Sequence, residues 1–161
     1  YDTRYARMLT TGLVDEAWEL DIEPVLEAKQ KMLERLQRKR RKRNENVQIP
    51  YLRSVDLNGV DSFRRLLQEI VQREEPGTTW HTIFVSEGVF IYLNPGVPMQ
   101  CLATCRETMP QSSFCFADLF RQVSKGNRSE AEREFQRIGW TLVDWLPKPG
   151  LARHMGVCHS S

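Results

Sequence analysis

The sequence has 161 residues, of which 40% are hydrophobic and 27% are charged, with a formal net charge of +2. This length and composition fit one globular domain that buries a hydrophobic core. A net charge this small does not indicate a polyanionic partner, so we expect no nucleic-acid binding. No apolar run approaches the roughly 20 residues that span a bilayer, so we expect no membrane partner.

The N-terminal residues, YDTRYARM, contain no signal-peptide core, which favours a cytoplasmic location. The sequence begins at Tyr1 rather than at a methionine, in a segment without cap or linker character. We therefore expect a single domain over residues 1–161 that is incomplete at its N-terminus. No pattern points to an oligomeric state.

Cysteines and histidines are too scattered to predict a metal site. They are Cys101, Cys105, Cys115, Cys158, His81, His154 and His159. Structural zinc needs four clustered ligands, so we expect none here. The spacing of Cys101 and Cys105 instead predicts two small buried side chains on one helix face.

The first predicted elements are a strand, an acid and a helix. Residues 17–21 alternate apolar and acidic side chains and end on Asp21, which indicates a short strand. Pro24 suits the first turn of the following helix, which runs into six basic residues, 38–43. Such a run is also found in nuclear localisation signals and nucleic-acid patches. We favour a solvated helix end, because the charges complement the helix dipole and no aromatic residues interleave them.

A second strand is predicted over residues 49–57, with Asp56 near its end. Asp61 is expected to cap the next helix, which residues 75–77 end. A further helix is predicted to begin with Asn94 as its cap, followed by a strand over residues 112–120.

Residues 79–93, TWHTIFVSEGVFIYL, contain the strand around which the chain is organised. The apolar run 83–85 is typical of a strand buried on both faces. Glu87 and Gly88 then interrupt the run, which places a carboxylate at the C-terminal edge of the strand. An acid in an exposed loop is the alternative interpretation of Glu87.

The last part of the chain predicts a capped helix and two strands. Ser129 has capping-box spacing and Gly139 ends that helix. Residues 140–146 and 153–159 are predicted strands joined by residues 147–150. Because no helix separates them, they should form an antiparallel hairpin.

Strands that alternate with helices predict an α/β fold with a largely parallel sheet. In such sheets, ligands bind outside the carboxyl ends of the strands. Asp21, Asp56 and Glu87 are therefore placed to hold hydroxyl, amine or cationic groups, as in nucleoside binding.

In chain order, the segments Asp2-Thr3-Arg4, WELDIEPVLEAKQKML, SVDL and SEGVFIYL resemble the S-adenosylmethionine-dependent leucine carboxyl methyltransferase family and its bacterial relatives. The resemblance covers Tyr1 to about Phe120. It implies a Rossmann-like class I methyltransferase sheet, mostly parallel with a C-terminal antiparallel hairpin. The family also carries a first strand and a glycine-rich turn before the Asp-Thr-Arg segment, and we expect this central strand to be missing here.

The resemblance also implies the residues that bind the cofactor, S-adenosylmethionine. Arg4 would lie near its methionine carboxylate, and Glu87 would approach its amino group. Asp21 would accept hydrogen bonds from the ribose hydroxyls, and Asp56 and Leu57 would border the adenine. Carboxylates suit these roles because they accept hydrogen bonds from hydroxyl and ammonium groups.

The implied reaction is methylation of a carboxylate or hydroxyl oxygen on a small molecule or a protein, with Tyr92 lining the acceptor side. Methyl transfer from a sulfonium is a direct displacement, so positioning of donor and acceptor supplies much of the catalysis. A carboxylate acceptor is ionised at neutral pH and needs no general base. We therefore expect no catalytic residue.

Two other functions stay open. One is an inactive remnant that serves as an interaction module, with residues 38–43 contacting an acidic partner. The other is a different nucleoside-binding α/β enzyme, such as a dehydrogenase. A strand and glycine-rich turn upstream of Tyr1 would favour the methyltransferase, whereas a genuine start at Tyr1 would favour the remnant.

Overall fold

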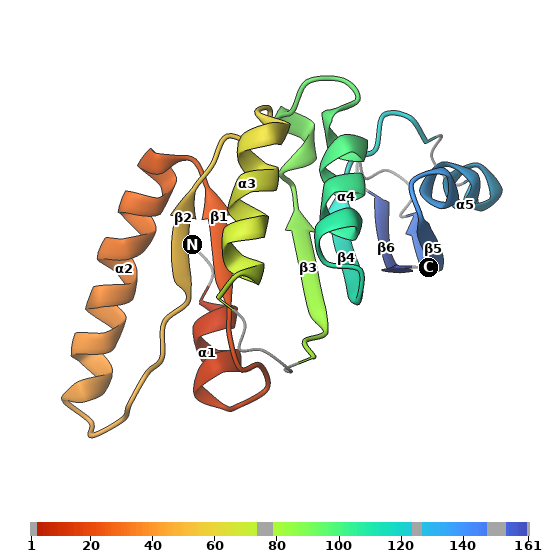
Figure 1. Cartoon of the computed structure of the whole chain (residues 1–161). Helices are drawn as coiled ribbons and strands as arrows, with labels where there is room; N and C mark the ends of the chain where they lie inside the picture. Colours follow the sequence, from red (N-terminus) through yellow and green to blue (C-terminus); the bar gives the residue numbers. More distant parts are fainter. Residues whose placement is uncertain (1–2, 74–78, 124–126, 148–153, 161) are drawn as a thin grey trace. The chain divides into compact units, whose positions relative to one another are not determined.

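The computed structural model describes residues 3–73, 79–123, 127–147 and 154–160 (Figure 1). The chain forms two compact units, Tyr1–Asp56 and Leu57–Ser161. The described strands form one two-stranded sheet in the first unit and one four-stranded sheet in the second.

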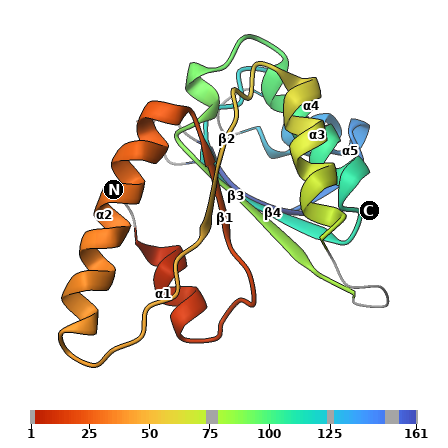
Figure 2. The same ribbon diagram turned by 60° about the vertical axis from the view of Figure 1, so that its left-hand side comes forward.

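The first unit contains two helices and two strands: α1 (Arg4–Thr10), β1 (Trp18–Asp21), α2 (Glu23–Arg41) and β2 (Tyr51–Ser54). As predicted, α2 has a proline in its first turn and ends within the basic run. β1 and β2 lie side by side and pair in parallel (Figures 1 and 2). β2 is shorter than predicted, because Pro50 has no backbone N–H for the ladder, which begins where the Tyr51 N–H donates to the Ala17 carbonyl oxygen at 2.9 Å.

An ion pair inside the first unit joins α2 to β1. Lys29 Nζ lies 2.6 Å from Glu19 Oε2, and the two side chains are only 7% and 15% exposed. Leu26 and Leu33, three residues before and four residues after Lys29, are buried on the same helix. Residues at this spacing share one face of a helix, so the lysine lies on the buried face of α2.

The second unit contains α3 (Val60–Val71), β3 (Thr82–Glu87), the 3₁₀ helix η1 (Phe90–Tyr92), α4 (Val97–Thr108), β4 (Ser112–Asp118), α5 (Arg128–Arg137), β5 (Trp140–Pro147) and β6 (His154–Ser160). Its strand order is β3-β4-β6-β5. β3 and β4 are parallel, whereas β6 is antiparallel to both β4 and β5. The predicted C-terminal antiparallel hairpin is therefore confirmed.

Aromatic side chains fill the space between the sheet and the helices of the second unit. Phe116 of β4 stacks on Phe135 of α5 with ring centroids 5.5 Å apart. Phe120 meets both rings edge-on, at 5.0 Å and 5.2 Å. Trp140 is fully buried, and its indole N–H donates to the Leu102 carbonyl oxygen of α4 at 3.0 Å. These contacts make one core from the sheet, α4 and α5.

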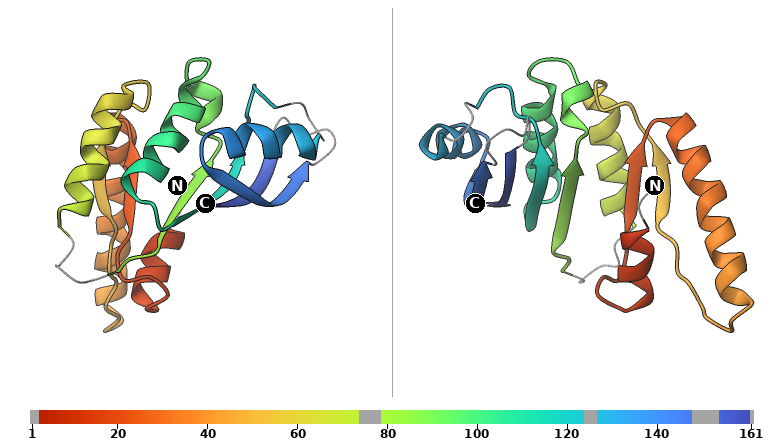
Figure 3. Two further views of the ribbon diagram at one scale, coloured as in Figure 1. Left: turned by 45° about the vertical axis from the view of Figure 1, so that its right-hand side comes forward. Right: turned by 180° about the vertical axis from the view of Figure 1, so that it is seen from behind.

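The predicted burial of β3 on both faces is wrong. Ile83 is 55% exposed and Val85 is 45% exposed, while Ser86 is buried. Seen from behind, β3 and β4 lie in front of both α3 and α4, so the two helices cover the same face of the sheet (Figure 3). A strand covered on one face buries only alternate side chains.

Helix starts also differ from the predicted caps. Asp61 lies in the first turn of α3, and Gly59 is the N-cap. Asn94 lies before Gly96, the N-cap of α4. Asn127, rather than Ser129, caps α5, and its side chain accepts the Glu130 N–H at 3.0 Å.

The predicted helix ends agree with the structure better than the predicted helix starts do, where the structure describes them. Gly139 follows α5 with φ +82°, a conformation that favours glycine. The predicted helix end at residues 75–77 and most of the predicted loop 147–150 lie outside the described residues. In the described part of the chain, every helix is too short or too polar to cross a membrane.

Candidate functional site

Two of the predicted acids lie at the carboxyl end of the parallel pair in the first unit. Asp21 is the last residue of β1 and is paired with Ser54, the last residue of β2. The Val55 N–H donates to the Asp21 carbonyl oxygen at 2.9 Å, so the chain stays beside β1 as it leaves β2. Asp56 follows at the same edge, two residues beyond β2 rather than within it, and both side chains are exposed. The structure therefore brings Asp21 and Asp56 to one edge.

The Asp21 carboxylate is oriented by the start of the next helix. Its Oδ1 accepts the backbone N–H of Ile22, the N-cap residue of α2, at 2.8 Å. A carboxylate has two oxygens with about four lone-pair directions. Asp21 can therefore keep this bond and still accept hydrogen bonds from a pair of neighbouring hydroxyl groups.

Glu87 occupies the corresponding edge of the sheet in the second unit. It is the last residue of β3, paired with Ala117 of β4, and its side chain is exposed. The next residue, Gly88, has φ +66°, and its N–H donates to the Ala117 carbonyl oxygen at 3.0 Å. The left-handed turn needs glycine, so the sequence Glu-Gly both ends the strand and fixes where the carboxylate emerges.

Leu57 is held within the second unit by contacts with two other segments. Its carbonyl oxygen accepts from the Cys101 thiol of α4 at 3.6 Å. The neighbouring Asn58 side chain accepts the Asn94 N–H at 2.9 Å, in the segment that follows η1. The predicted adenine-side residue therefore lies beside the first half of α4.

The predicted acceptor-side residue, Tyr92, ends η1 and is 79% exposed. A shallow cleft lies between the segment that runs from η1 into α4 and the chain that follows β4, lined in part by Phe90, Pro95, Leu119 and Arg121. Arg121 donates to the Ile91 carbonyl oxygen at 3.4 Å. This contact holds the Arg121 guanidinium beside η1. The sequence interpretation missed Arg121, because its only signal was a basic residue just after a predicted strand.

The remaining predicted cofactor residue, Arg4, is the first residue of α1 and is exposed. Its neighbour Asp2 lies outside the described residues. The role of Arg4 beside a methionine carboxylate stays a prediction.

The cysteines are poorly suited to act as nucleophiles or metal ligands. Burial raises the pKa of Cys101 and of Cys158 to about 12, which leaves both thiols neutral at pH 7. Within the described ranges, no cluster of three or more histidine, cysteine, aspartate or glutamate residues could hold a metal ion.

Comparison with solved structures shows the fold of this arrangement. One similar structure is described as a pericyclic reaction enzyme, with a TM-score of 0.54 and 10% identity. Another is OxaC in complex with SAH and oxaline, with a TM-score of 0.53 and 14% identity. Each match covers 91% of this chain and 36% of the other, so the chain spans about a third of the length of these proteins. The predicted Rossmann-like methyltransferase fold is confirmed.

Comparison of sequences gives the family. No curated protein matches the sequence significantly. The family model for leucine carboxyl methyltransferases matches residues 1–105, which is more than half of the 161 residues. The chain therefore belongs to the leucine carboxyl methyltransferase family.

Proposed function

We propose that this protein is an S-adenosylmethionine-dependent O-methyltransferase that acts on a carboxylate or hydroxyl group. The observation that carries the proposal is the position of its acids. Asp21 and Glu87 end parallel strands, and Asp56 lies just beyond a third strand end, where ligands of α/β sheets bind. Membership of a methyltransferase family agrees with this arrangement and argues against the dehydrogenase alternative.

Each proposed cofactor contact matches the chemistry of its residue. Asp21 accepts hydrogen bonds from the ribose hydroxyls, while Asp56 and Leu57 border the adenine. Glu87 forms a charge-assisted hydrogen bond with the methionine ammonium, and Arg4 pairs with the methionine carboxylate. Four of these five residues are acidic or basic, which suits the charged and hydroxylated parts of the cofactor.

A carboxylate is the acceptor that the described residues favour. Arg121 donates to the Ile91 carbonyl oxygen of η1, and its guanidinium can pair with a carboxylate. Tyr92 lies at the end of the same 3₁₀ helix. A carboxylate oxygen would attack the methyl carbon while the carbon–sulfur bond breaks and its electrons go to sulfur. The products are a methyl ester and S-adenosylhomocysteine. No proton is transferred, so no general base is needed.

The proposal is tested by calorimetric titration with S-adenosylhomocysteine. Asp21→Ala removes the acceptor for the ribose hydroxyls, and losing hydrogen bonds to a charged group costs about 1.5 to 3 kcal/mol. The dissociation constant should therefore rise by about 10-fold to 150-fold. Glu27→Ala is a matched control, because Glu27 is an exposed acid on α2 away from the strand end. Equal affinity of Asp21→Ala and the wild type would remove Asp21 from the site.

A further inference from the structure

A fully buried carboxylate lies directly behind the turn that carries Glu87. Asp118 is the last residue of β4 and is 0% exposed. Its Oδ2 accepts from the Ser86 hydroxyl at 2.5 Å and from the Val89 N–H at 2.9 Å. Its Oδ1 accepts the Phe90 N–H at 2.9 Å and the Leu119 N–H at 3.0 Å. Four donors therefore converge on one side chain.

Three of the four donors flank Glu87 in the sequence. Ser86 precedes it, while Val89 and Phe90 follow after the glycine turn and start η1. The carboxylate thus bonds to the chain on both sides of Glu87, from a strand about 30 residues later. Because the donors belong to the end of β3 and the start of η1, the direction in which Glu87 leaves the sheet depends on Asp118.

We propose that Asp118 is a positioning residue that holds the Glu87 carboxylate in place for the amino group of the cofactor. The inference rests on the proposed function, since it concerns the same site. Asp118 itself is fully buried and is not proposed to contact the cofactor. It acts through the backbone of the Glu87 turn, and through η1 it also fixes the start of the segment that bears Tyr92.

The isosteric variant Asp118→Asn gives a specific structural consequence. An amide has one acceptor oxygen, which keeps the Phe90 and Leu119 bonds when it occupies the Oδ1 position. The amide NH₂ then faces Ser86 and Val89. The Ser86 hydroxyl can turn and accept from it, because a hydroxyl both donates and accepts. The Val89 N–H can only donate, so this bond is lost and the turn beside Glu87 loosens.

Two readouts test the proposal on the whole chain. In Asp118→Asn, hydrogen exchange of the Val89 amide should rise at least 10-fold, while exchange in the middle of β4, at Phe114 and Phe116, should stay within 2-fold of the wild type. The dissociation constant for S-adenosylhomocysteine should rise at least 10-fold, as it should in Glu87→Ala. Ser86→Ala removes one donor without placing two donors against each other, so it should fold normally. It should weaken binding less than Asp118→Asn does.

The double variant separates positioning from a general loss of stability. If Asp118 acts through Glu87, then Glu87→Ala combined with Asp118→Asn should bind no more weakly than Glu87→Ala alone. The inference would be overturned if the double variant raised the dissociation constant by the product of the two single-variant factors. Unchanged affinity in Asp118→Asn would also overturn it. If Asp118→Asn does not unfold cooperatively and is therefore not properly folded, the test rests on Ser86→Ala. Affinity equal to the wild type in Ser86→Ala would then overturn the inference. Absence of binding by the wild type would instead overturn the proposed function, and the inference with it.

Discussion

At the scale of single residues, burial determines the reactivity of the four cysteines. Burial raises the pKa of Cys101 and Cys158 to about 12, and it raises the pKa of Cys105 well above its usual range. Cys115 is only half-buried, and its pKa is also raised by burial. The thiolate is the reactive species, and at pH 8 a thiol with a pKa of about 12 is roughly one part in 10⁴ ionised.

We therefore expect a thiol-alkylating reagent at pH 8 to modify Cys115 first. The other three cysteines should react at a comparable rate only after the chain is unfolded in denaturant. Peptide mass spectrometry after brief alkylation would measure the order of modification. Early labelling of Cys105 would contradict the burial described for α4.

Two residues that the sequence interpretation missed show a limit of reading single residues. Asp118 ends β4, two residues before the predicted end of that strand, and its role depends on donors about 30 residues earlier in the chain. Arg121 follows it and lines the cleft only because η1 lies opposite. Neither contact produces a periodic pattern in the sequence, whereas the Glu87-Gly88 pair by itself indicates the end of a strand.

At the scale of elements, the buried ion pair between Lys29 and Glu19 ties α2 to β1. Removing one partner of a buried pair leaves the other charge without compensation, at a cost of about 3 to 5 kcal/mol. Lys29→Met should lower the free energy of unfolding by that amount in urea titrations. Replacing both partners, as in Glu19→Leu with Lys29→Met, should recover most of the loss.

The exposed ion pair between Arg128 and Glu132 on α5 is the matched control. An exposed pair one turn apart on a helix contributes only about 0.3 to 0.5 kcal/mol, so Glu132→Gln, which leaves the bond from Arg128 to the Val143 carbonyl oxygen in place, should have little effect on unfolding. Equal losses of unfolding free energy at the two sites would contradict the claim that burial makes the Lys29 pair important for stability.

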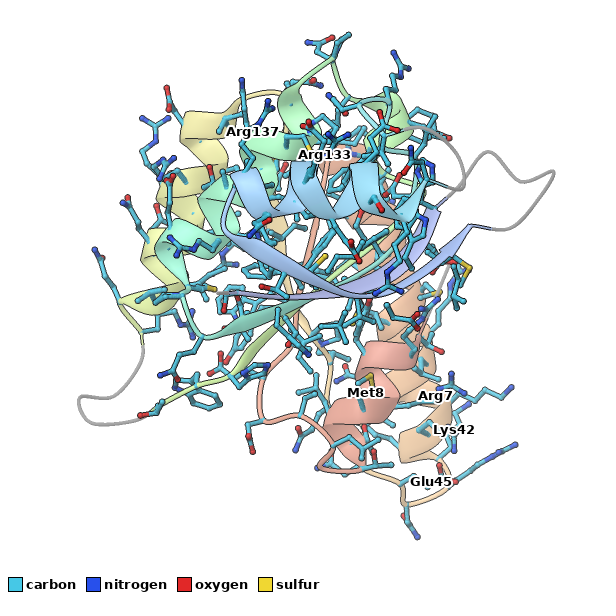
Figure 4. The ribbon with its side chains drawn as sticks, turned by 90° about the vertical axis from the view of Figure 1, so that its right-hand side faces the viewer. Arg7, Met8, Lys42, Glu45, Arg133 and Arg137 are labelled. Carbon is cyan, nitrogen blue, oxygen red and sulfur yellow. The ribbon has the colours of Figure 1, made fainter. Side chains whose placement is uncertain are left out.

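The basic run at the end of α2 is an exposed helix end in the structure. Arg40 pairs with Glu45, and the exposed Arg41, Lys42 and Arg43 follow it. Figure 4 shows Lys42 and Glu45 at this end of the helix. We expect that replacing Arg41, Lys42 and Arg43 by Gln leaves affinity for S-adenosylhomocysteine unchanged in calorimetry. If the wild type binds nucleic acid with a steep salt dependence that the variant loses, the run is an interaction site instead.

The elements themselves were largely predictable, because apolar periodicity and glycine turns are local signals. The strands ending at Asp21 and Glu87 and the C-terminal hairpin follow from such patterns. The choice of Asn127 over Ser129 as a cap does not, since both residues cap well and the packing of α5 decides where the helix starts. Burial of residues 83–85 was mispredicted because it depends on which helices cover the sheet.

At the scale of the whole molecule, the order of short segments was more informative than any one of them. The family resemblance rested on four segments spread over the first 93 residues, and the family model matches residues 1–105. Composition alone indicated only a globular chain, and the alternation of strands and helices indicated the α/β class. The order of acids along the chain predicted a cofactor site because each acid follows a strand, and the structure places Asp21 and Glu87 at strand ends within their own units.

The central claim is that these strand ends bind S-adenosylmethionine, and nuclear magnetic resonance tests it most directly. The ¹⁵N-labelled chain would be titrated with S-adenosylhomocysteine to millimolar concentration, so that weak binding is also detected. The account predicts chemical-shift changes at the backbone amides of Ile22, Leu57 and Gly88, each of which follows one of the three acids. Amides of α5, such as that of Ala131, should not change. A titration that moves none of the three amides, or that moves α5 instead, would contradict the account.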